Sequence, residues 1–208
     1  MELIITAPSV VYRVRKTDGE QFMIENPTKL PDPSAIEKIE EPFIRANILV
    51  PPSSIGSIMQ LCQDRRGIYK STEYLDPRIV LLVYELPFAE VVLDFYDKIK
   101  TMTSGYGSFN YEFIGYQEAK LVKLDILING EPVDSLSSIV IEENAYYRGK
   151  ALVSKLREVI PRQMFEVAIQ AAIGAKVISR ETVSAMKKNV IEKCYGGDIS
   201  HKRKLLDK

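Results

Sequence analysis

In the middle of the chain, segments with a strand-like hydrophobic pattern alternate with segments in which apolar residues recur at helical spacing. Four segments are rich in β-branched, aliphatic and aromatic side chains and are bounded by turn residues, a pattern typical of strands. They are residues 43–50, 68–75, 79–86 and 109–113. Between these runs, apolar residues recur at helical spacing in two groups: Ile55, Ile58, Met59 and Cys62, and Val91, Val92, Phe95 and Ile99. The order β-α-β-β-α-β predicts a ferredoxin-like sandwich.

Capping and helix-breaking residues predict where the first helix begins and ends. A serine of the Pro51-Pro52-Ser53-Ser54 segment can cap the helix, because a serine oxygen accepts a hydrogen bond from a free amide of the first turn. Gly67 is expected to end it.

The first forty residues carry weaker signals. Residues 10–14 and 21–24 predict a hairpin around a Thr-Asp-Gly-Glu turn, and Pro27, Pro31 and Pro33 predict a stiff linker. A two-stranded hairpin is marginal alone, so we expect it to lean on a neighbour.

The last ninety residues predict a third module. Residues 122–128 alternate strictly and precede Asn129-Gly130, a strong hairpin signal. A helical pattern covers 147–160, and strands are expected at 165–169 and 175–178. A basic helix over 182–193, a glycine-broken loop over 194–198 and a second basic helix over 199–208 complete the prediction. The whole chain is thus expected to be α+β, with modules at 1–40, 41–118 and 119–208.

Charge is distributed unevenly along the chain. The 208 residues contain 28 basic and 28 acidic side chains, giving a formal net charge of zero. Residues 145–208, however, hold 14 basic and 6 acidic side chains, a net +8 that the rest of the chain balances. A segregated basic segment favours a polyanionic partner, either nucleic acid or an anionic membrane surface. Interleaved tyrosines favour RNA, where stacking supplements charge.

Signs of catalytic chemistry are weak. The sequence has no phosphate-cradling Gly-x-x-x-x-Gly-Lys-Ser/Thr segment, and His201 is its single histidine, so neither a histidine metal site nor a serine–histidine triad is expected. Cys62 and Cys194 lie far apart and are read as reduced thiols of a cytosolic protein. No secretory signal or membrane-spanning run is present in the sequence.

Candidate RNA contacts come from basic residues and from a glycine loop. For Arg65 and Arg66 a second interpretation is open, since basic residues at the end of a helix also complement its dipole. The segment Gly105 to Tyr111 partly matches an RNA-binding RNP1 motif, but a glycine-rich turn into a core strand explains it better. The full predicted set is Arg65, Arg66, Arg148, Lys150, Arg162, Lys176, Arg180, Lys187, Lys188, Lys193, Tyr195, Gly196, Gly197, Lys202, Arg203 and Lys204. We expect its C-terminal members to form one continuous face.

Several longer motifs carry a family resemblance. Residues 64–67, 87–97 and 104–108 resemble the fifth domain of elongation factor G in the form found in the LepA family of bacterial translational GTPases. Residues 127–131, 160–163, 169–174 and 193–200 resemble the C-terminal domain peculiar to that family. Residues 6–12 are similar to the end of its third domain.

The resemblance implies a fragment that binds the ribosome, large-subunit rRNA and tRNA, and that includes contacts near the stalk-base ribosomal proteins. It implies back-translocation, translation fidelity, initiation or subunit assembly as the cellular role, and a cytoplasmic location that includes peripheral association with the inner membrane. GTP and Mg²⁺ would belong to the parent protein's GTPase domain, so no cofactor and no catalytic site are expected in this chain, which we expect to be a monomer. The alternative is a protein-interaction module that docks ribosomal proteins without direct RNA contact.

Overall fold

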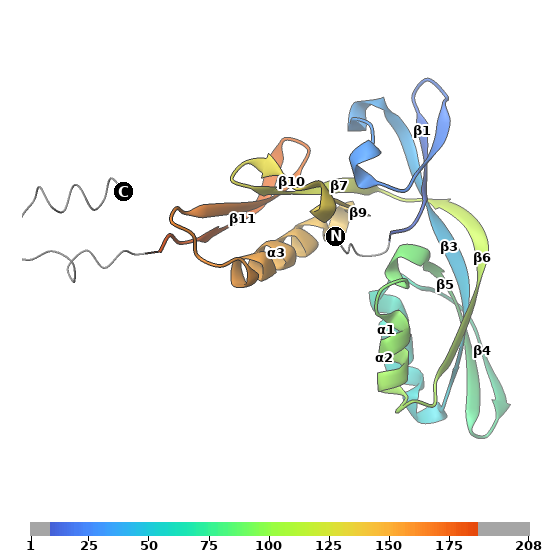
Figure 1. Cartoon of the computed structure of the whole chain (residues 1–208). Helices are drawn as coiled ribbons and strands as arrows, with labels where there is room; N and C mark the ends of the chain where they lie inside the picture. The colour runs from blue at the N-terminus through green and yellow to red at the C-terminus, as the bar shows by residue number, and fades with distance from the viewer. Residues whose placement is uncertain (1–8, 187–208) are drawn as a thin grey trace, which may run out of the picture. The chain divides into compact units, whose positions relative to one another are not determined.

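The structure, a computed structural model, describes residues 9–186 and divides the chain into two compact units (Figure 1). Unit 1 comprises the residues up to 123 together with 135–143, and unit 2 comprises 124–134 and the residues from 144 onward. The sheets are antiparallel and helices pack on them, so the predicted α+β class is confirmed. The hairpin expected as a separate module lies in the same unit as the ferredoxin-like domain.

The larger part of unit 1 is the ferredoxin-like sandwich. Its elements, in chain order, are β3 (Ile36–Val50), α1 (Ile55–Asp64), β4 (Ile68–Asp76), β5 (Ile79–Pro87), α2 (Phe95–Met102) and β6 (Ser108–Glu118). The strands lie in the order β6-β3-β5-β4, all antiparallel, and both helices cover one face (Figure 1). This arrangement confirms the predicted split-βαβ motif.

The core of the sandwich lies between the sheet and the two helices. Alternate residues of β3 and β5, such as Ile48 and Leu82, are fully buried because successive side chains of a strand point to opposite faces. Ile58 on α1, with Phe95 and Ile99 on α2, closes the core from the helix side. Burying each such side chain contributes about 1.5–3 kcal/mol.

The N-terminal end of α1 differs from the prediction. A short 3₁₀ turn, η3 (Pro52–Ser54), precedes the helix, and Ser54 stands at the N-cap position with backbone angles close to helical. Its side chain makes no capping bond and instead donates from Oγ to the carbonyl oxygen of Met102 at 3.3 Å. The serine therefore ties the start of α1 to the end of α2.

The second helix begins later than its apolar spacing indicates. A 3₁₀ turn, η4 (Phe88–Glu90), follows β5, and α2 starts only at Phe95. Val91 packs into the core of the sandwich, whereas Val92 packs against a separate cluster under the N-terminal hairpin. The helical spacing in the sequence placed both valines on one helix face, but in the structure they pack in two different cores.

The N-terminal hairpin consists of β1 (Tyr12–Lys16) and β2 (Gln21–Ile24). Strand β1 also pairs with residues 36–40 of β3, so the hairpin leans on a neighbour as expected. Between β2 and β3 the predicted proline linker folds into two 3₁₀ turns, η1 (Pro27–Lys29) and η2 (Pro33–Ala35).

Unit 2 is built on a second antiparallel sheet, of which the start of β7 and the whole of β9 are assigned to unit 1. The elements of this part of the chain are β7 (Leu121–Ile128), β8 (Glu131–Pro132), η5 (Asp134–Leu136), β9 (Ser138–Ile141), α3 (Glu142–Val159), β10 (Val167–Ile173) and β11 (Lys176–Val183). The strands follow the order β11-β10-β7-β8, and β9 pairs with β7. The predicted turn at Asn129-Gly130 is present, with positive φ at both residues (53° and 88°).

Helix α3 packs on this sheet through its smallest residue. A Cβ on Gly149 would lie 3.0 Å from Cβ of Ala171 and 3.2 Å from Cδ1 of Ile178, so a larger residue would require these neighbours to shift by a few tenths of an ångström. The helix begins at Glu142, five residues earlier than predicted. The basic helix expected from residue 182 is wrong at its start, because Thr182 and Val183 pair with β10 as part of β11.

Candidate nucleic-acid interface

The structure describes seven of the sixteen predicted RNA contacts. Arg65 and Arg66 lie at the end of α1 in unit 1. Five more lie in unit 2: Arg148, Lys150, Arg162, Lys176 and Arg180. The other nine fall outside the described residues: Lys187, Lys188, Lys193, Tyr195, Gly196, Gly197, Lys202, Arg203 and Lys204.

The end of α1 turns both arginines toward neighbouring carboxylates. Arg66 adopts a left-handed conformation, with φ of 61°, and the amide of Gly67 donates to the carbonyl oxygen of Cys62 at 2.7 Å. This is the hydrogen-bonding pattern that commonly closes a helix. A Cβ on Gly67 would lie 2.7 Å from that same carbonyl oxygen, so the predicted helix-ending glycine is required sterically.

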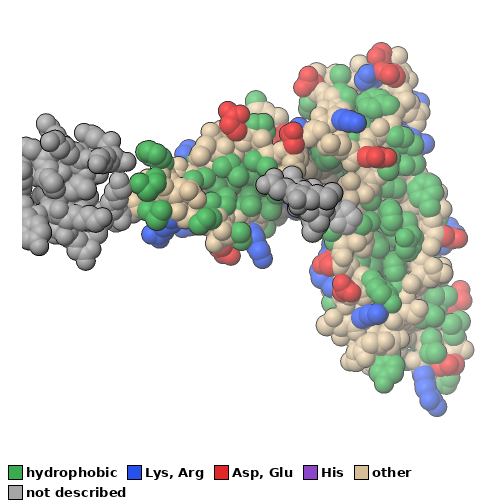
Figure 2. Space-filling view, in the orientation of Figure 1, with side chains coloured by type: hydrophobic (Ala, Val, Ile, Leu, Met, Phe, Trp, Pro, Cys, Tyr) green, Lys and Arg blue, Asp and Glu red, His purple; other side chains and the backbone are tan. Residues whose placement is uncertain are grey.

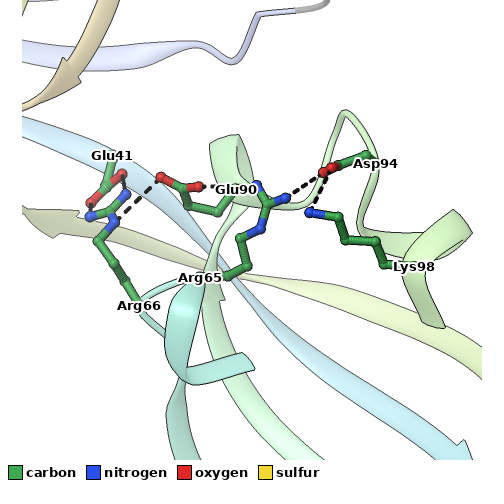
Figure 3. Close-up of polar contacts among 6 residues, drawn as sticks. All are labelled: Glu41, Arg65, Arg66, Glu90, Asp94 and Lys98. Atoms are coloured by element: carbon green, nitrogen blue, oxygen red, sulfur yellow. Dashed lines mark hydrogen bonds and ion pairs between the residues drawn. The ribbon is translucent and has the colours of Figure 1, made fainter. Parts of the chain in front are cut away.

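Arg65 and Arg66 belong to an ion-pair cluster that also contains Glu41, Glu90 and Asp94 (Figure 3). Arg66 donates from Nη1 to Glu41 Oε1 at 2.7 Å and from Nη2 to Glu41 Oε2 at 2.9 Å. Arg65 donates from Nη2 to Asp94 Oδ1 at 2.6 Å, and its Nη1 lies 3.5 Å from Glu90 Oε2. Glu90 therefore joins the two arginines, since its other oxygen lies 3.6 Å from Nε of Arg66.

Burial separates the two ends of this cluster. The side chain of Glu41 is 1% exposed, whereas that of Asp94 is 46% exposed and also pairs with Lys98 at 2.9 Å. The hydrogen bond from Lys98, assisted by Arg65, lowers the pKa of Asp94. Burial opposes the charge of Arg66, but its pKa is raised because the hydrogen bonds and charges of Glu41 and Glu90 outweigh that effect.

The cluster gives both arginines a structural task. Their side chains are about four-fifths buried and hold three carboxylates between α1, β3 and the η4–α2 segment. These contacts give Arg65 and Arg66 a structural role in ion pairing, which differs from the helix-dipole role considered from the sequence. An RNA contact by Arg65 or Arg66 stays a prediction.

The described basic residues of unit 2 are exposed but do not share one face. Arg148 and Lys150 lie on α3, Arg162 in the loop after it and Lys176 at the β10–β11 turn. Arg180 on β11 lies opposite Gln170 on β10 in the strand register. The next register pair, Ile169 with Glu181, faces α3, since Glu181 bonds to Arg157 on that helix. Successive side chains of a strand alternate between faces, so Arg180 points away from α3. Figure 2 likewise shows basic side chains spaced apart over this unit. The expected continuous face is not formed by these members.

A smaller group on α3 does lie together. Tyr146, Lys150 and Arg157 are separated by four and then seven residues and so occupy one side of the helix. We call these three residues the α3 row. Arg157 is anchored by an ion pair between its Nη1 and Oε2 of Glu181 at 2.9 Å. Tyr147, which is 71% exposed, packs edge-on against Tyr146 with ring centroids 5.6 Å apart.

The glycine-rich segment from Gly105 leads into a packed strand. The amide of Gly107 donates to Thr103 Oγ1 at 2.7 Å, and a Cβ there would lie 2.6 Å from that oxygen. Phe109 is paired with Ile48 and packs on Phe95 with ring centroids 5.4 Å apart. Its ring therefore faces the helices, which agrees with the structural interpretation of this segment.

Sequence reasoning missed a cationic group on the N-terminal hairpin. Arg13 and Arg15 alternate with buried Tyr12 and Val14 on β1, and Lys38 is the register partner of Arg15 on β3. The alternation in the sequence could have placed Arg13 and Arg15 on one face, but the pairing with Lys38 is a tertiary fact.

Two kinds of site find no support in residues 9–186. No three His, Cys, Asp or Glu side chains within this range gather as metal ligands. Among the helices of residues 9–186, none combines the length and the apolar character that a membrane span needs.

Comparisons with known proteins match both units. Residues 38–127 match the family described as elongation factor G C-terminus, and residues 128–208 match that described as GTP-binding protein LepA C-terminus. The whole chain is 58% identical to elongation factor 4 of Anoxybacillus flavithermus and 56% identical to that of Bacillus cytotoxicus. In both cases 100% of this chain aligns with 34% of the relative, so the chain spans about a third of the relatives' length. A solved structure from Thermus thermophilus is 29% identical, with a TM-score of 0.37, over 39% of this chain and 12% of that one.

Proposed function

Because the chain belongs to the LepA family and corresponds to the C-terminal region of its members, we propose that it is the ribosome-binding, RNA-contacting part of a translational GTPase. Its partners in this proposal are the ribosome, large-subunit rRNA and tRNA. The function served would be that of the parent protein on elongating ribosomes, with back-translocation and translation fidelity as the proposed outcome.

The α3 row carries the proposal for RNA contact. Tyr146 is 48% exposed, and Lys150 lies one helical turn further along the same side. An exposed ring offers a stacking surface to an unpaired base, and a neighbouring ammonium group neutralises the adjoining phosphate. At the other end of the row, Arg157 forms an ion pair with Glu181.

The test is ribosome and tRNA binding by the full chain at two salt concentrations. We expect Tyr146→Ala/Lys150→Gln to weaken binding by about tenfold, since base stacking alone is worth ~1–3 kcal/mol. We also expect binding of the unmodified chain to weaken steeply with salt, as displaced counterions require. The matched control is Lys155→Gln, which removes an equal charge from the same helix about 140° around its axis. Equal effects of the two variants, or binding that ignores salt, would contradict the proposal.

A protein-docking function is the alternative, and exposed rings on β6 favour it. Phe113 is 59% exposed and Tyr111 is 47% exposed on the outer strand of the sandwich. Exposed apolar side chains on an edge strand are typical of surfaces that receive another protein, such as a ribosomal protein of the stalk base. This alternative predicts that Phe113→Ser reduces ribosome affinity while the α3 double variant leaves it unchanged.

The chemistry of the parent protein is assigned to the part that this chain does not span. We place GTP, Mg²⁺ and GTP hydrolysis there, and we place the protein in the cytoplasm as a monomer, with peripheral membrane association as a second proposed location. Turnover of GTP by the purified chain would refute this assignment. Sedimentation of the chain with vesicles containing anionic lipids would support the membrane association.

A further inference from the structure

The outer face of the N-terminal hairpin gathers three cations on a small stretch of sheet. On β1, Tyr12 and Val14 are buried while Arg13 and Arg15 point outward. In the sheet, Arg15 lies between Gln21 on β2 and Lys38 on β3. Strands on both sides thus hold this group in place.

The same side chains line a recess. Its walls are Arg13, Arg15, Gln21, Lys38 and Glu40, and its volume is about 170 Å³. Four of the five side chains carry hydrogen-bond donors, and Glu40 is the one carboxylate among them.

Glu40 organises one end of the recess. It accepts hydrogen bonds from Nε of Arg13 and from Nζ of Lys38, the latter at 2.7 Å. The guanidinium of Arg13 also lies over the ring of Tyr116, 4.7 Å from its centroid. Glu118 is the register partner of Glu40 on β6, so acidic groups lie toward the β6 side of the recess. Arg13 is therefore held in place by its neighbours on both β3 and β6.

At the other end of the recess Arg15 is less well compensated than Lys38, because Nζ of Lys38 is already paired with Glu40. Nε of Arg15 lies 3.9 Å from Oε2 of Glu37, at the limit of an ion pair, and Arg15 stands directly opposite Lys38. Like charges directly opposite each other in a sheet are destabilising. Glu40 offsets the charge of Lys38 from one side only, and an oxyanion bound between Arg15 and Lys38 would attract both of them.

We propose that this recess binds a phosphate group, with Arg15 and Lys38 as its charged ligands and the Gln21 amide as a neutral donor. A phosphate presents several acceptor oxygens, and a guanidinium donates to two of them at once. The phosphate is either a free one or part of an RNA backbone. The inference does not depend on the α3 row, because it concerns the other unit of the chain.

The experiment is an NMR titration of the ¹⁵N-labelled full chain with inorganic phosphate at constant ionic strength, repeated with a short single-stranded RNA. We expect saturable shifts confined to β1, β2 and the start of β3. In Arg15→Gln/Lys38→Gln, phosphate affinity should fall by about tenfold or more, because hydrogen bonds to charged groups are worth more than neutral ones. Arg15→Gln alone provides a second variant that spares the Glu40 contacts.

The control is Lys16→Gln, a cation of the same strand that lies over the ring of Phe22 on the opposite side of the sheet. Phosphate should also raise the melting temperature of the unmodified chain and of the control, but not that of the double variant. Saturation by inorganic phosphate identifies a free phosphate as sufficient, and saturation by RNA alone identifies a backbone phosphate. Linear shifts spread over the whole chain in both titrations, or equal affinities in all variants, would overturn the proposal. Loss of RNA binding in the α3 variant with these shifts intact would leave this inference standing.

Discussion

Replacing Arg66 by methionine tests whether the ion-pair cluster is structural. Methionine keeps most of the side-chain volume but removes the guanidinium that donates twice to Glu41. The carboxylate of Glu41 is 1% exposed, so it would be left buried and charged with its fork of donors gone. Removing one partner of a buried pair costs about 3–5 kcal/mol. Because the Arg66 side chain is 22% exposed, and water can reach this edge, we expect the lower end, about 3 kcal/mol.

The assay is urea unfolding at neutral pH, followed by circular dichroism, with slope and midpoint fitted separately. Arg78→Met in the exposed β4–β5 turn is the control and should change the free energy of unfolding by less than about 0.5 kcal/mol. Adding Glu41→Leu to Arg66→Met should recover part of the loss, because the stranded charge is then gone.

Ribosome affinity separates the ion-pairing role that the structure shows for Arg66 from the RNA contact that the sequence also allowed. If the cluster is structural, Arg66→Met measured under conditions where it remains folded should bind ribosomes as the unmodified chain does. A loss of under about 1 kcal/mol in stability, accompanied by a clear loss of ribosome affinity, would refute the structural reasoning and support an RNA contact.

Three further outcomes are expected. Gly67→Ala should lower the free energy of unfolding in urea by about 1–3 kcal/mol, because the new Cβ would lie 2.7 Å from the carbonyl oxygen of Cys62. The control Gly56→Ala, which has open space around it on α1, should raise the free energy of unfolding by up to ~1 kcal/mol. Equal effects of the two variants would contradict the packing at Gly67. The pKa of Asp94 is lowered in the folded chain, so the stability it contributes is complete above its ordinary pKa of 3.8 and is lost as pH falls through the lower folded pKa. Asp94→Asn should therefore reduce stability at neutral pH, by at most ~1 kcal/mol because the pair is so exposed, and should have no effect at strongly acidic pH. A penalty that does not change with pH would contradict this ion-pair role of Asp94. Burial raises the pKa of the Cys62 thiol to about 12, so this thiol should react slowly in the folded chain. In a Cys194→Ser background, its reaction with a disulfide reagent at mildly alkaline pH should be ~100-fold slower in the folded chain than in the urea-unfolded chain. Comparable rates in the two states would show that the site around Cys62 opens.

Local patterns were sufficient to predict the sandwich of unit 1. Each of its six elements had a hydrophobic period and a turn signal, and the order of elements left few topologies. The Asn129-Gly130 turn was predictable for the same reason, because the required positive φ angles restrict the residue types.

The errors arose where tertiary contacts outweighed local pattern. Val91 and Val92 looked like one helical face but pack in two cores. Thr182 and Val183 carried a helical pattern, yet pairing with β10 made them a strand. Such pairing depends on the partner strand and not on the residues themselves.

The candidate site shows the same limit. Sequence could identify basic residues, but it could not say which of them face carboxylates. Arg66 meets Glu41 across a separation of 25 residues, and Arg157 meets Glu181 across 24. Conversely, the phosphate recess joins side chains from three strands, so no short motif marks it.

Strand β3 belongs both to the hairpin sheet and to the ferredoxin-like sandwich. Its first residues pair with β1, and its later ones pair with β5 and β6. A boundary drawn at residue 41 would therefore cut through a continuous hydrogen-bonded ladder. The backbone amides of β1 and of the first residues of β3 should therefore exchange with solvent together, and a shortened chain that begins after β1 would expose the edge of β3 that β1 covers.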